Sequence, residues 1–351
     1  MLALLLTDYR KLQLVDLPVP SLAADEVLIQ VAACGICGSD VHGFDGSTGR
    51  RIPPLVMGHE AAGVIVALGR AVDTFSLGER VTFDSTISCG SCAFCQRGAV
   101  NLCDHREVLG VSCGDYRRNG AFAEYVAVPA RIVYRLPDSL GFADAAMIEA
   151  VSVALHAVSL TAPEKGSTAL VVGAGMIGLL ILQSLRVAGC GDVFVTDIDA
   201  GRLELAKNLG ATETIKADKA TTRDEFVAKV RELTGGYGAD NVLEAVGNAP
   251  TIKTAIESAR KNATVTLVGN LTPEVPLPLQ YVITHQLRLQ GSCASAGEYP
   301  QAIELMARKQ IDVSPMLSAI APLTEGAHWF DRLYAREANL MKVVLTPESM
   351  A

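Results

Sequence analysis

Short apolar runs separated by clusters of glycine, proline and aspartate dominate the first 150 or so residues of the chain. Three such runs lie at residues 26–31, 61–66 and 124–128. Runs of this length between turn residues are typical of β-strands. This part of the chain is therefore predicted to form a β-rich barrel or twisted sheet.

From about residue 168 the pattern changes to apolar runs that alternate with longer helical stretches. The runs at 168–172 and 193–196 are each followed by a stretch with helical spacing, and the second stretch ends before Gly210. This alternation is typical of a parallel, doubly wound sheet, so the chain is predicted to be an α/β protein. Later strands of the same sheet are predicted at 241–246, 264–268 and 287–290.

After about residue 293 come a helical stretch around Ile303, Leu305 and Met306 and a terminal strand at 341–345. We expect these elements to return to the β-rich part. A length of 351 residues is ample for two domains, each with its own core.

Composition and charge narrow the classes of protein. Half of the residues are hydrophobic and 19% are charged, as in compact globular proteins. The net charge of −8 disfavours nucleic-acid and membrane partners, which attract cationic surfaces. The apolar start at 1–6 is too short for a signal peptide, and no run approaches the ~18 apolar residues of a membrane span.

Four of the nine cysteines are closely spaced. Gaps of two, two and seven residues separate Cys89, Cys92, Cys95 and Cys103. Four thiolates around one tetrahedral ion form a closed structural zinc site, which leaves no position for water or substrate. An odd number of cysteines with metal-like spacing favours a reducing compartment, so we expect a cytoplasmic protein.

A glycine motif directly follows the run at 168–172 and opens a helix. In such a motif the first glycine forms a tight turn, the second lets the backbone approach a pyrophosphate, and the third packs the helix against the strand. The residues expected to bind a dinucleotide are Gly173, Gly175, Met176, Ile177, Gly178, Asp197 and Arg202.

The charges after the second apolar run favour NAD over NADP. Asp197 can accept both ribose hydroxyls, whereas its charge and that of Asp199 would repel a 2′-phosphate. Arg202 can stack on adenine or reach a phosphate, and the alternative is a solvated helix residue. NAD is the predicted cofactor.

A second set of metal-binding side chains is spread along the first domain. Cys37, His59 and Glu60 offer sulfur, nitrogen and oxygen ligands, and Glu149 lies at the domain boundary. Each has a plain structural alternative, such as a buried thiol, a core imidazole or a solvated carboxylate. Because three protein ligands with an open position define catalytic zinc, the set beside a nucleotide motif predicts a second zinc.

Together these segments resemble the zinc-dependent medium-chain alcohol dehydrogenases, and among them the sorbitol and polyol branch. The resemblance covers essentially the whole chain. It implies a GroES-like catalytic domain at 1–152, to which 294–351 return, and a Rossmann NAD-binding domain at 153–293. The matching segments are 34–42, 58–63, the four-cysteine lobe, 149–153 with His156, the glycine motif and 195–197.

The resemblance also implies roles for single residues. Cys37 and His59 match the usual zinc ligands of the family. Glu60 matches a glutamate that ligates the zinc directly or approaches it in alternation with water. Glu149 matches an acid that stands where alcohol dehydrogenases place a second cysteine, and which of the two is the direct third ligand stays open. Zinc lowers the pKa of a bound alcohol, which favours hydride transfer to NAD.

Three neighbours of the zinc ligands complete the implied site. Asp40 matches the carboxylate behind the zinc histidine, which would fix its tautomer. Ser39 and His42 match a proton relay to solvent. The structural alternatives are a loop-capping hydroxyl for Ser39 and a solvated imidazole for His42.

The chain departs from the sorbitol-type pattern at the substrate. Cys293, Ala294 and Ser295 stand where that branch has an aromatic residue, an arginine and a tyrosine. Arg50 and Arg51 form a basic pair that could receive a substrate phosphate or carboxylate, unless both are solvated loop residues.

The predicted function is NAD-dependent oxidation of a secondary alcohol, in a polyol, a sugar alcohol or its phosphate, or a cyclic sugar. The alternatives are a threonine or vicinal-diol dehydrogenase and, in another class, a non-catalytic nucleotide-binding or redox-sensing relative. The resemblance further implies a homodimer or homotetramer.

Overall fold

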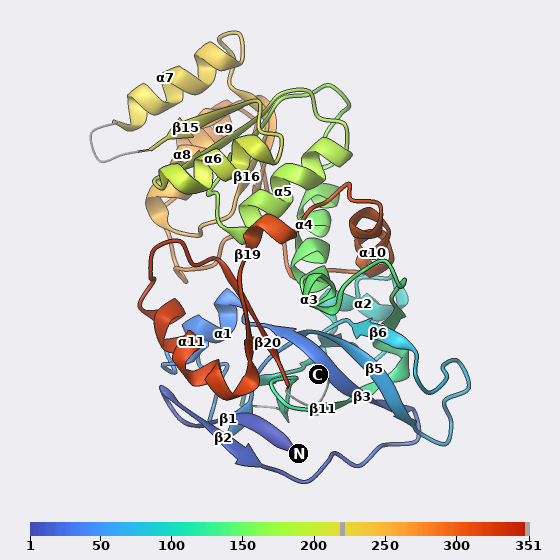
Figure 1. Cartoon of the computed structure of the whole chain (residues 1–351). Coiled ribbons are helices and arrows are strands. Elements are labelled where there is room, and N and C mark those ends of the chain that lie inside the picture. The colour runs from blue at the N-terminus through green and yellow to red at the C-terminus, as the bar shows by residue number, and fades with distance from the viewer. Residues whose placement is uncertain (115, 218–221, 348–351) are drawn as a thin grey trace. The chain divides into compact units, whose positions relative to one another are not determined.

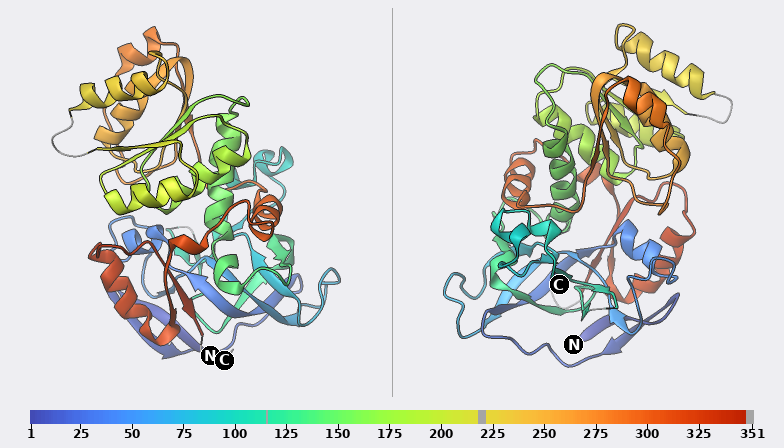
Figure 2. Two further views of the ribbon diagram at one scale, coloured as in Figure 1. Left: turned by 45° about the horizontal axis from the view of Figure 1, so that its top comes forward. Right: turned by 180° about the vertical axis from the view of Figure 1, so that it is seen from behind.

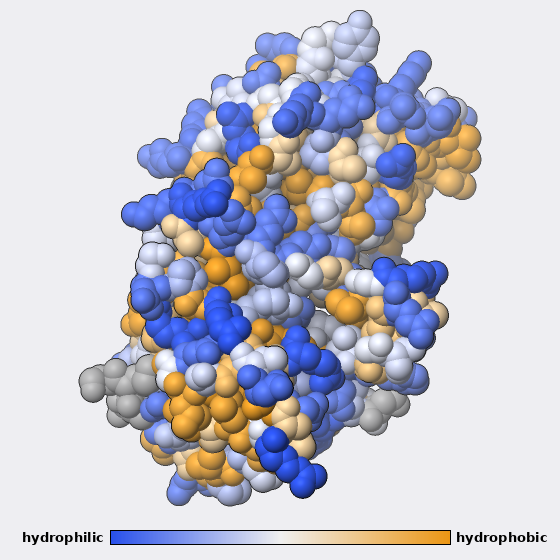
Figure 3. Space-filling view, turned by 90° about the vertical axis from the view of Figure 1, so that its right-hand side faces the viewer, coloured by the Kyte–Doolittle hydropathy of each residue, from blue (hydrophilic) through white to orange (hydrophobic). Residues whose placement is uncertain are grey.

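The computed structural model shows strands and helices along the whole chain (Figure 1). It describes residues 1–114, 116–217 and 222–347. Of the helices in these ranges, none combines the length and the apolar character that a membrane span needs. One face of the molecule carries hydrophilic side chains with apolar patches between them (Figure 3).

The chain divides into two compact units. The predicted boundaries lay at 152/153 and 293/294, with every residue from 294 onwards in the first domain. The structure instead groups residues 150–152, 294–298 and 309–312 with the second unit. The first unit contains Met1–Glu149, Tyr299–Arg308 and Val313–Ala351, and the second contains Ala150–Glu298 and Lys309–Asp312.

A seven-stranded sheet forms the centre of the first unit, in the order β12-β6-β5-β3-β20-β19, with β11 paired to β3. The C-terminal strand β20 lies beside β3, where Val344 is opposite Gly35 and Leu345 is opposite Cys34. The C-terminal strand thus belongs to the sheet of the first unit. The strands are β3 (Glu26–Gly35), β5 (Glu60–Leu68), β6 (Arg80–Phe83), β11 (Tyr125–Pro129), β12 (Val133–Arg135), β19 (Leu317–Pro322) and β20 (Lys342–Thr346).

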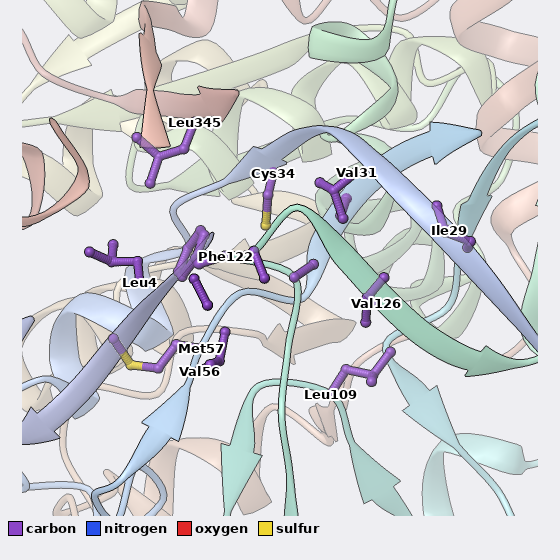
Figure 4. Close-up of a cluster of buried hydrophobic side chains, with 14 of the residues drawn as sticks. Leu4, Ile29, Val31, Cys34, Val56, Met57, Leu109, Phe122, Val126 and Leu345 are labelled. Atoms are coloured by element: carbon purple, nitrogen blue, oxygen red, sulfur yellow. The ribbon is translucent and has the colours of Figure 1, made fainter. Parts of the chain in front are cut away.

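The core of the first unit lies against this sheet (Figure 4). Ile29 and Val31 on β3 and Leu345 on β20 are fully buried and are joined by Leu4 and Phe122. Alternate residues of a strand point to the same face, which explains how β3 buries Ile29 and Val31 together.

Smaller elements surround the main sheet of the first unit. Short β-pairs brace its loops, and short helices carry several of the predicted site residues. The strands are β1 (Leu2–Asp8), β2 (Lys11–Asp16), β4 (Leu55–Val56), β7 (Thr86–Ile87), β8 (Glu107–Val108), β9 (Val111–Ser112) and β10 (Arg117–Arg118), and the α-helices are α1 (Gly38–Gly43), α2 (Ala93–Gln96), α3 (Phe142–Ala145), α10 (Tyr299–Ala307) and α11 (Gly326–Tyr334).

The second unit is built on a six-stranded, fully parallel sheet in the order β15-β14-β13-β16-β17-β18. This order, with helices on both faces, is that of the Rossmann fold (Figures 1 and 2). The strands are β13 (Ala169–Val172), β14 (Val193–Asp197), β15 (Glu213–Lys216), β16 (Ala239–Glu244), β17 (Ala259–Leu267) and β18 (Arg288–Gly291), and the helices are α5 (Met176–Val187), α6 (Ala200–Asn208), α7 (Arg223–Leu233), α8 (Ala249–Ser258) and α9 (Leu279–Thr284). Helix α4 (Ile148–Thr161) begins in the first unit and continues into the second.

The α/β class and the strands predicted from the apolar runs are confirmed. The prediction missed β15, because its sequence Glu-Thr-Ile-Lys offers only one strongly apolar position. An edge strand such as this one needs little apolar character, since its outer side has no neighbouring strand.

Candidate functional site

The four closely spaced cysteines converge at one point of the first unit. Their sulfur atoms lie within 4.8 Å of one another, on the segment that carries α2. Hydrogen bonds from the backbone and hydroxyl of Ser91 and the backbone of Cys92 lower the pKa of Cys89 to about 5. Four sulfurs with this spacing fit a closed zinc site.

Cys37, His59 and Glu60 form a second convergent group, whose ligand atoms also lie within 4.8 Å of one another. Cys37 is the N-cap of α1, and Glu60 is the first residue of β5, directly after His59. Strand pairing places Glu60 opposite Gly35 on β3. A Cβ on Gly35 would lie 2.4 Å from Glu60 Oε2, so any larger residue there would have to displace this carboxylate.

Two features of the second group suit a zinc ion: its set of donor atoms and one oxygen of the Glu60 carboxylate. Glu60 is only 1% exposed, and within the described ranges its Oε1 has no hydrogen-bond partner. A buried carboxylate oxygen without a partner is costly unless a cation or a donor reaches it. Sulfur, nitrogen and oxygen donors from three residues, with a fourth position left open, suit catalytic zinc.

Glu149 lies near this group but outside it. It stands in the first turn of α4, and its carboxylate is not among the ligand atoms that converge within 4.8 Å. Burial raises the pKa of Glu149 to about 7, with Glu60 adding to the rise and His59 opposing it. The geometry therefore favours Glu60 over Glu149 as the third ligand.

Lys342 is a site residue that the sequence analysis missed. It is fully buried at the start of β20, where its Nζ donates to Glu60 Oε2 and, at 3.1 Å, to the carbonyl of Ile36. Burial alone would lower the pKa of Lys342, but the charges of Glu60 and Cys37 raise it. A lysine within the apolar terminal strand was the one available sign in the sequence.

Ser39 lies beside the ligand group, in the first turn of α1. Its Oγ is 3.3 Å from Cys37 Sγ and 3.4 Å from His59 Nε2. His42 is exposed and lies in the last turn of the same helix. The structure thus places Ser39 at the candidate metal site and His42 one turn further, towards solvent.

Asp40 and Arg51 form a buried ion pair behind the ligand group. Asp40 Oδ1 lies 2.9 Å from Arg51 Nη2 and 3.4 Å from His59 Nδ1. Burial raises the pKa of Asp40, but the neighbouring His59 and Arg51 outweigh burial and lower this pKa to about 2. Arg51 is thus not a solvated loop residue: Arg50 is exposed, whereas the guanidinium of Arg51 is engaged inside the protein.

The glycine motif of the second unit has the predicted geometry. Gly173 has a φ of +101°, a conformation that favours glycine, and Gly175 is the N-cap of α5. A Cβ on Gly178 would lie 1.8 Å from the carbonyl oxygen of Gly173, so only a glycine allows this packing of helix on strand. Met176 and Ile177 form the first turn of α5, whose free N–H groups suit a pyrophosphate.

Asp197 ends β14 next to the glycine motif. Its Oδ2 accepts from the N–H of Ala174 at 2.7 Å, and its Oδ1 accepts from the N–H of Asp199 at 2.9 Å. Arg202 lies in the first turn of α6, whose N-cap is Asp199. Two acids therefore stand where the ribose of a dinucleotide binds in a Rossmann fold.

Comparisons with known families agree with both units. Residues 23–138 match the alcohol dehydrogenase GroES-like domain, and residues 177–308 match the zinc-binding dehydrogenase family. The chain belongs to the zinc-binding medium-chain dehydrogenases, and it is an enzyme of their polyol dehydrogenase branch.

Two curated relatives show the extent of the similarity. Sorbitol dehydrogenase of Bacillus subtilis is 33% identical, over 99% of this chain and 97% of its own. D-arabitol-phosphate dehydrogenase of Enterococcus avium is 35% identical, over 96% of this chain and 94% of its own.

Solved structures agree with the fold. Galactitol-1-phosphate dehydrogenase from Escherichia coli has a TM-score of 0.91 at 28% identity, over 99% of this chain and 100% of its own. A zinc-binding dehydrogenase from Sinorhizobium meliloti 1021, solved bound to NADP, has a TM-score of 0.90 at 32% identity, over 99% of both chains. A third solved relative is complexed with NADH. Similar structures thus include one with NADP and one with NADH.

Proposed function

We propose that the protein oxidises a secondary alcohol to a ketone with NAD, and that its substrate is a polyol, a sugar alcohol or its phosphate, or a cyclic sugar. The observation that carries the proposal is the convergence of Cys37, His59 and Glu60, together with a Glu60 Oε1 to which no group among the described residues donates. Zinc, when bound, supplies Lewis acidity that favours loss of the alcohol proton, and NAD, when bound, accepts the hydride.

The proton route is proposed to begin at Ser39. Its exposed hydroxyl lies beside Cys37 Sγ and His59 Nε2, so it can accept the proton of an alcohol held at the ligand group while it releases its own proton. His42, exposed in the last turn of α1, can pass that proton to water.

The preference for NAD rests on Asp197 and Asp199. Their carboxylates lie within hydrogen-bond distance of backbone N–H groups at the end of β14 and the start of α6. A 2′-phosphate at this place would meet both negative charges, whereas two ribose hydroxyls would find acceptors.

The substrate proposal draws on the named relatives and on Arg50. Two of the relatives described above act on polyol phosphates by name, and Arg50 is an exposed cation near α1. A phosphorylated polyol is therefore one member of the proposed substrate class. The alternatives are threonine or a vicinal diol, such as the substrate of the similar 2R,3R-butanediol dehydrogenase of Bacillus subtilis.

Metal analysis together with a substrate panel tests the proposed function. We expect two zinc ions per chain, of which one is removed by a chelator with loss of NADH production. The panel contains polyols, polyol phosphates, threonine and a vicinal diol, each assayed with NAD and with NADP. A single inert zinc and no turnover on any alcohol would support a non-catalytic nucleotide-binding protein instead.

We propose a homodimer or homotetramer that forms along the second unit. β18 is an edge strand of the parallel sheet, and Leu277, Leu279 and Ile283 before it are 45%, 65% and 66% exposed. Light scattering should give two or four times the monomer mass, and Ile283→Asp should lower it. A monomer mass for the unmodified protein at all concentrations would contradict the proposal.

We also propose a cytoplasmic location. Five of the described cysteines lie in groups with the geometry of metal sites, four in one group and Cys37 beside His59 and Glu60 in the other. Thiolate sites of this kind persist in a reducing compartment.

A further inference from the structure

Arg51 is buried behind the candidate metal site, with all three guanidinium nitrogens engaged. It is 4% exposed. Nε and Nη2 donate to Asp40 Oδ1 at 3.0 and 2.9 Å, Nη2 also donates to Ser39 Oγ at 3.2 Å, and Nη1 donates to the carbonyl of Arg50 at 3.1 Å. A planar guanidinium held by this many acceptors has one orientation.

The backbone around Arg51 is anchored independently of its side chain. Ser112 on β9 is 1% exposed and forms a parallel bridge with Arg51. Its Oγ accepts from the N–H of Ile52 at 2.6 Å, and its own N–H donates to the carbonyl of Arg50 at 3.2 Å. The guanidinium is therefore presented from a fixed segment rather than from a free loop.

Gly43 at the end of α1 makes room for the Arg51 side chain. A Cβ at this position would lie 2.4 Å from Cγ of Arg51 and 3.2 Å from its Cβ. Real Cβ atoms do not approach other carbon atoms so closely, so any larger residue at position 43 must displace the stem of Arg51. Arg51 therefore packs against Gly43 at the end of α1 and bonds to Ser39 and Asp40 in its first turn.

The residues that Arg51 contacts connect it to both segments of the ligand group. Ser39 and Asp40 lie in the first turn of α1, directly after its N-cap Cys37. Asp40 Oδ1, which accepts from Arg51, also lies 3.4 Å from His59 Nδ1. One guanidinium therefore braces the helix that begins at Cys37 and the carboxylate that faces His59.

The contact with Ser39 also sets the direction of its hydroxyl. Because Arg51 Nη2 donates to Ser39 Oγ, the hydroxyl hydrogen must point away from Arg51. The other polar atoms near Ser39 Oγ are Cys37 Sγ at 3.3 Å and His59 Nε2 at 3.4 Å. Arg51 thereby takes up one lone pair of Ser39 Oγ and leaves the other lone pair, with the hydroxyl hydrogen, on the side of the ligand group.

We propose that Arg51 is a positioning residue for the candidate metal site, which fixes Cys37 and His59 through Asp40 and orients the Ser39 hydroxyl by direct contact. This inference rests on the proposed function and adds a residue to it. It replaces the expectation that Arg51 binds an anionic substrate. Arg51 acts through its neighbours and does not touch the alcohol.

Arg51→Met tests the proposal in the zinc-loaded protein. Loss of a supporting partner behind a metal ligand typically costs about 10–100-fold in metal affinity or activity. We expect a chelator to remove zinc from the second group about 10–100-fold faster, and kcat to fall by a similar factor with little change in KM. The time course of zinc release assigns each zinc ion to its group, because the phase that is missing in Cys37→Ser protein belongs to the second group.

Arg51→Lys separates the two contacts of Arg51. A single ammonium can neutralise Asp40, but it lacks the planar fork that reaches Ser39 at the same time. We expect zinc release close to that of the unmodified protein, together with a kcat that stays reduced. A merely structural arginine would give parallel changes in both quantities.

Two further variants keep the test decisive if Arg51→Met does not fold. Gly43→Ala should displace the Arg51 stem and give the same pattern as Arg51→Met with the guanidinium still present. Arg118→Met removes another partly buried arginine, paired with Glu26 and Glu107. It should lower thermal stability while zinc release and kcat stay unchanged.

Unchanged zinc release and kcat in folded Arg51→Met or Gly43→Ala protein would overturn the proposal and leave the proposed function intact. A raised KM for phosphorylated polyols alone would also overturn it and make Arg51 a substrate contact. If the unmodified protein holds no releasable zinc, the proposed function itself fails.

Discussion

Lys342→Met is expected to lower the free energy of unfolding by about 3–5 kcal/mol, the usual cost of removing one partner of a buried ion pair. Lys342 and Glu60 are each 1% exposed, so the Glu60 carboxylate would remain in the interior without its counter-charge. The carbonyl of Ile36 would lose a donor in the same change. Chemical denaturation of the metal-free protein measures the loss, because a bound cation would partly compensate the free carboxylate.

A double variant and an exposed pair are the controls for this prediction. Glu60→Gln combined with Lys342→Met removes both charges and should recover most of the lost stability, since the two residues are in direct contact. Lys11→Met breaks an ion pair with Asp8 in which both side chains are more than half exposed. It should leave stability nearly unchanged, because solvent screens exposed pairs. A loss for Lys342→Met no larger than that for Lys11→Met would contradict the prediction.

Cys37→Ser is expected to reduce turnover at least ~100-fold, more than the loss of a supporting partner costs, while NAD still binds. Cys37 supplies the sulfur donor of the second ligand group and the N-cap of α1. The glycine motif and Asp197 belong to the other unit of the chain, which folds around its own core. NADH production measures turnover, and calorimetric titration with NAD measures binding.

Cys95→Ser is the matched control, with the opposite pattern expected. Cys95 lies in the four-sulfur group, where a structural zinc contributes to folding and takes no part in the reaction. The variant should therefore lose stability or yield, while the protein that does fold keeps its kcat. Equal loss of turnover in both variants would show that the two sulfur groups do not have separate roles.

The features that depend on short stretches of chain could be predicted from the sequence. The spacing of Cys89 to Cys103 allows one local segment to bring four sulfurs together, and the structure shows them converged. The glycine motif is equally local, because Gly173 and Gly178 meet within one strand, turn and helix. The apolar runs of the parallel sheet likewise predict their own strands, with β15 missed for lack of apolar positions.

The features that depend on pairing between distant strands could not be predicted. Lys342 meets Glu60 across 282 positions, only because β20 lies beside β3 and β3 lies beside β5. Nothing near Lys342 in the sequence specifies that register. The sequence predicts only a terminal strand at 341–345.

The burial of Arg51, which lies in a loop, could not be predicted either. Its sequence context, a basic pair after two glycines, is that of an exposed segment, and Arg50 is indeed exposed. Arg51 is buried because Ser112 anchors its backbone and Gly43 leaves space for its stem. Whether a charged residue binds a substrate or supports a site is thus decided by partners from other segments.

Spacing and side-chain chemistry are local properties, so the α/β class, the dinucleotide motif and the donor atoms of both sulfur-containing sites could be predicted from the sequence. The tertiary structure was needed to show that Glu60 converges with Cys37 and His59. It also showed that Lys342 pairs with Glu60 and that Arg51 pairs with Asp40. Burial explains the difference. A charge inside the protein must have a partner, and strand register and packing choose which residue that partner is.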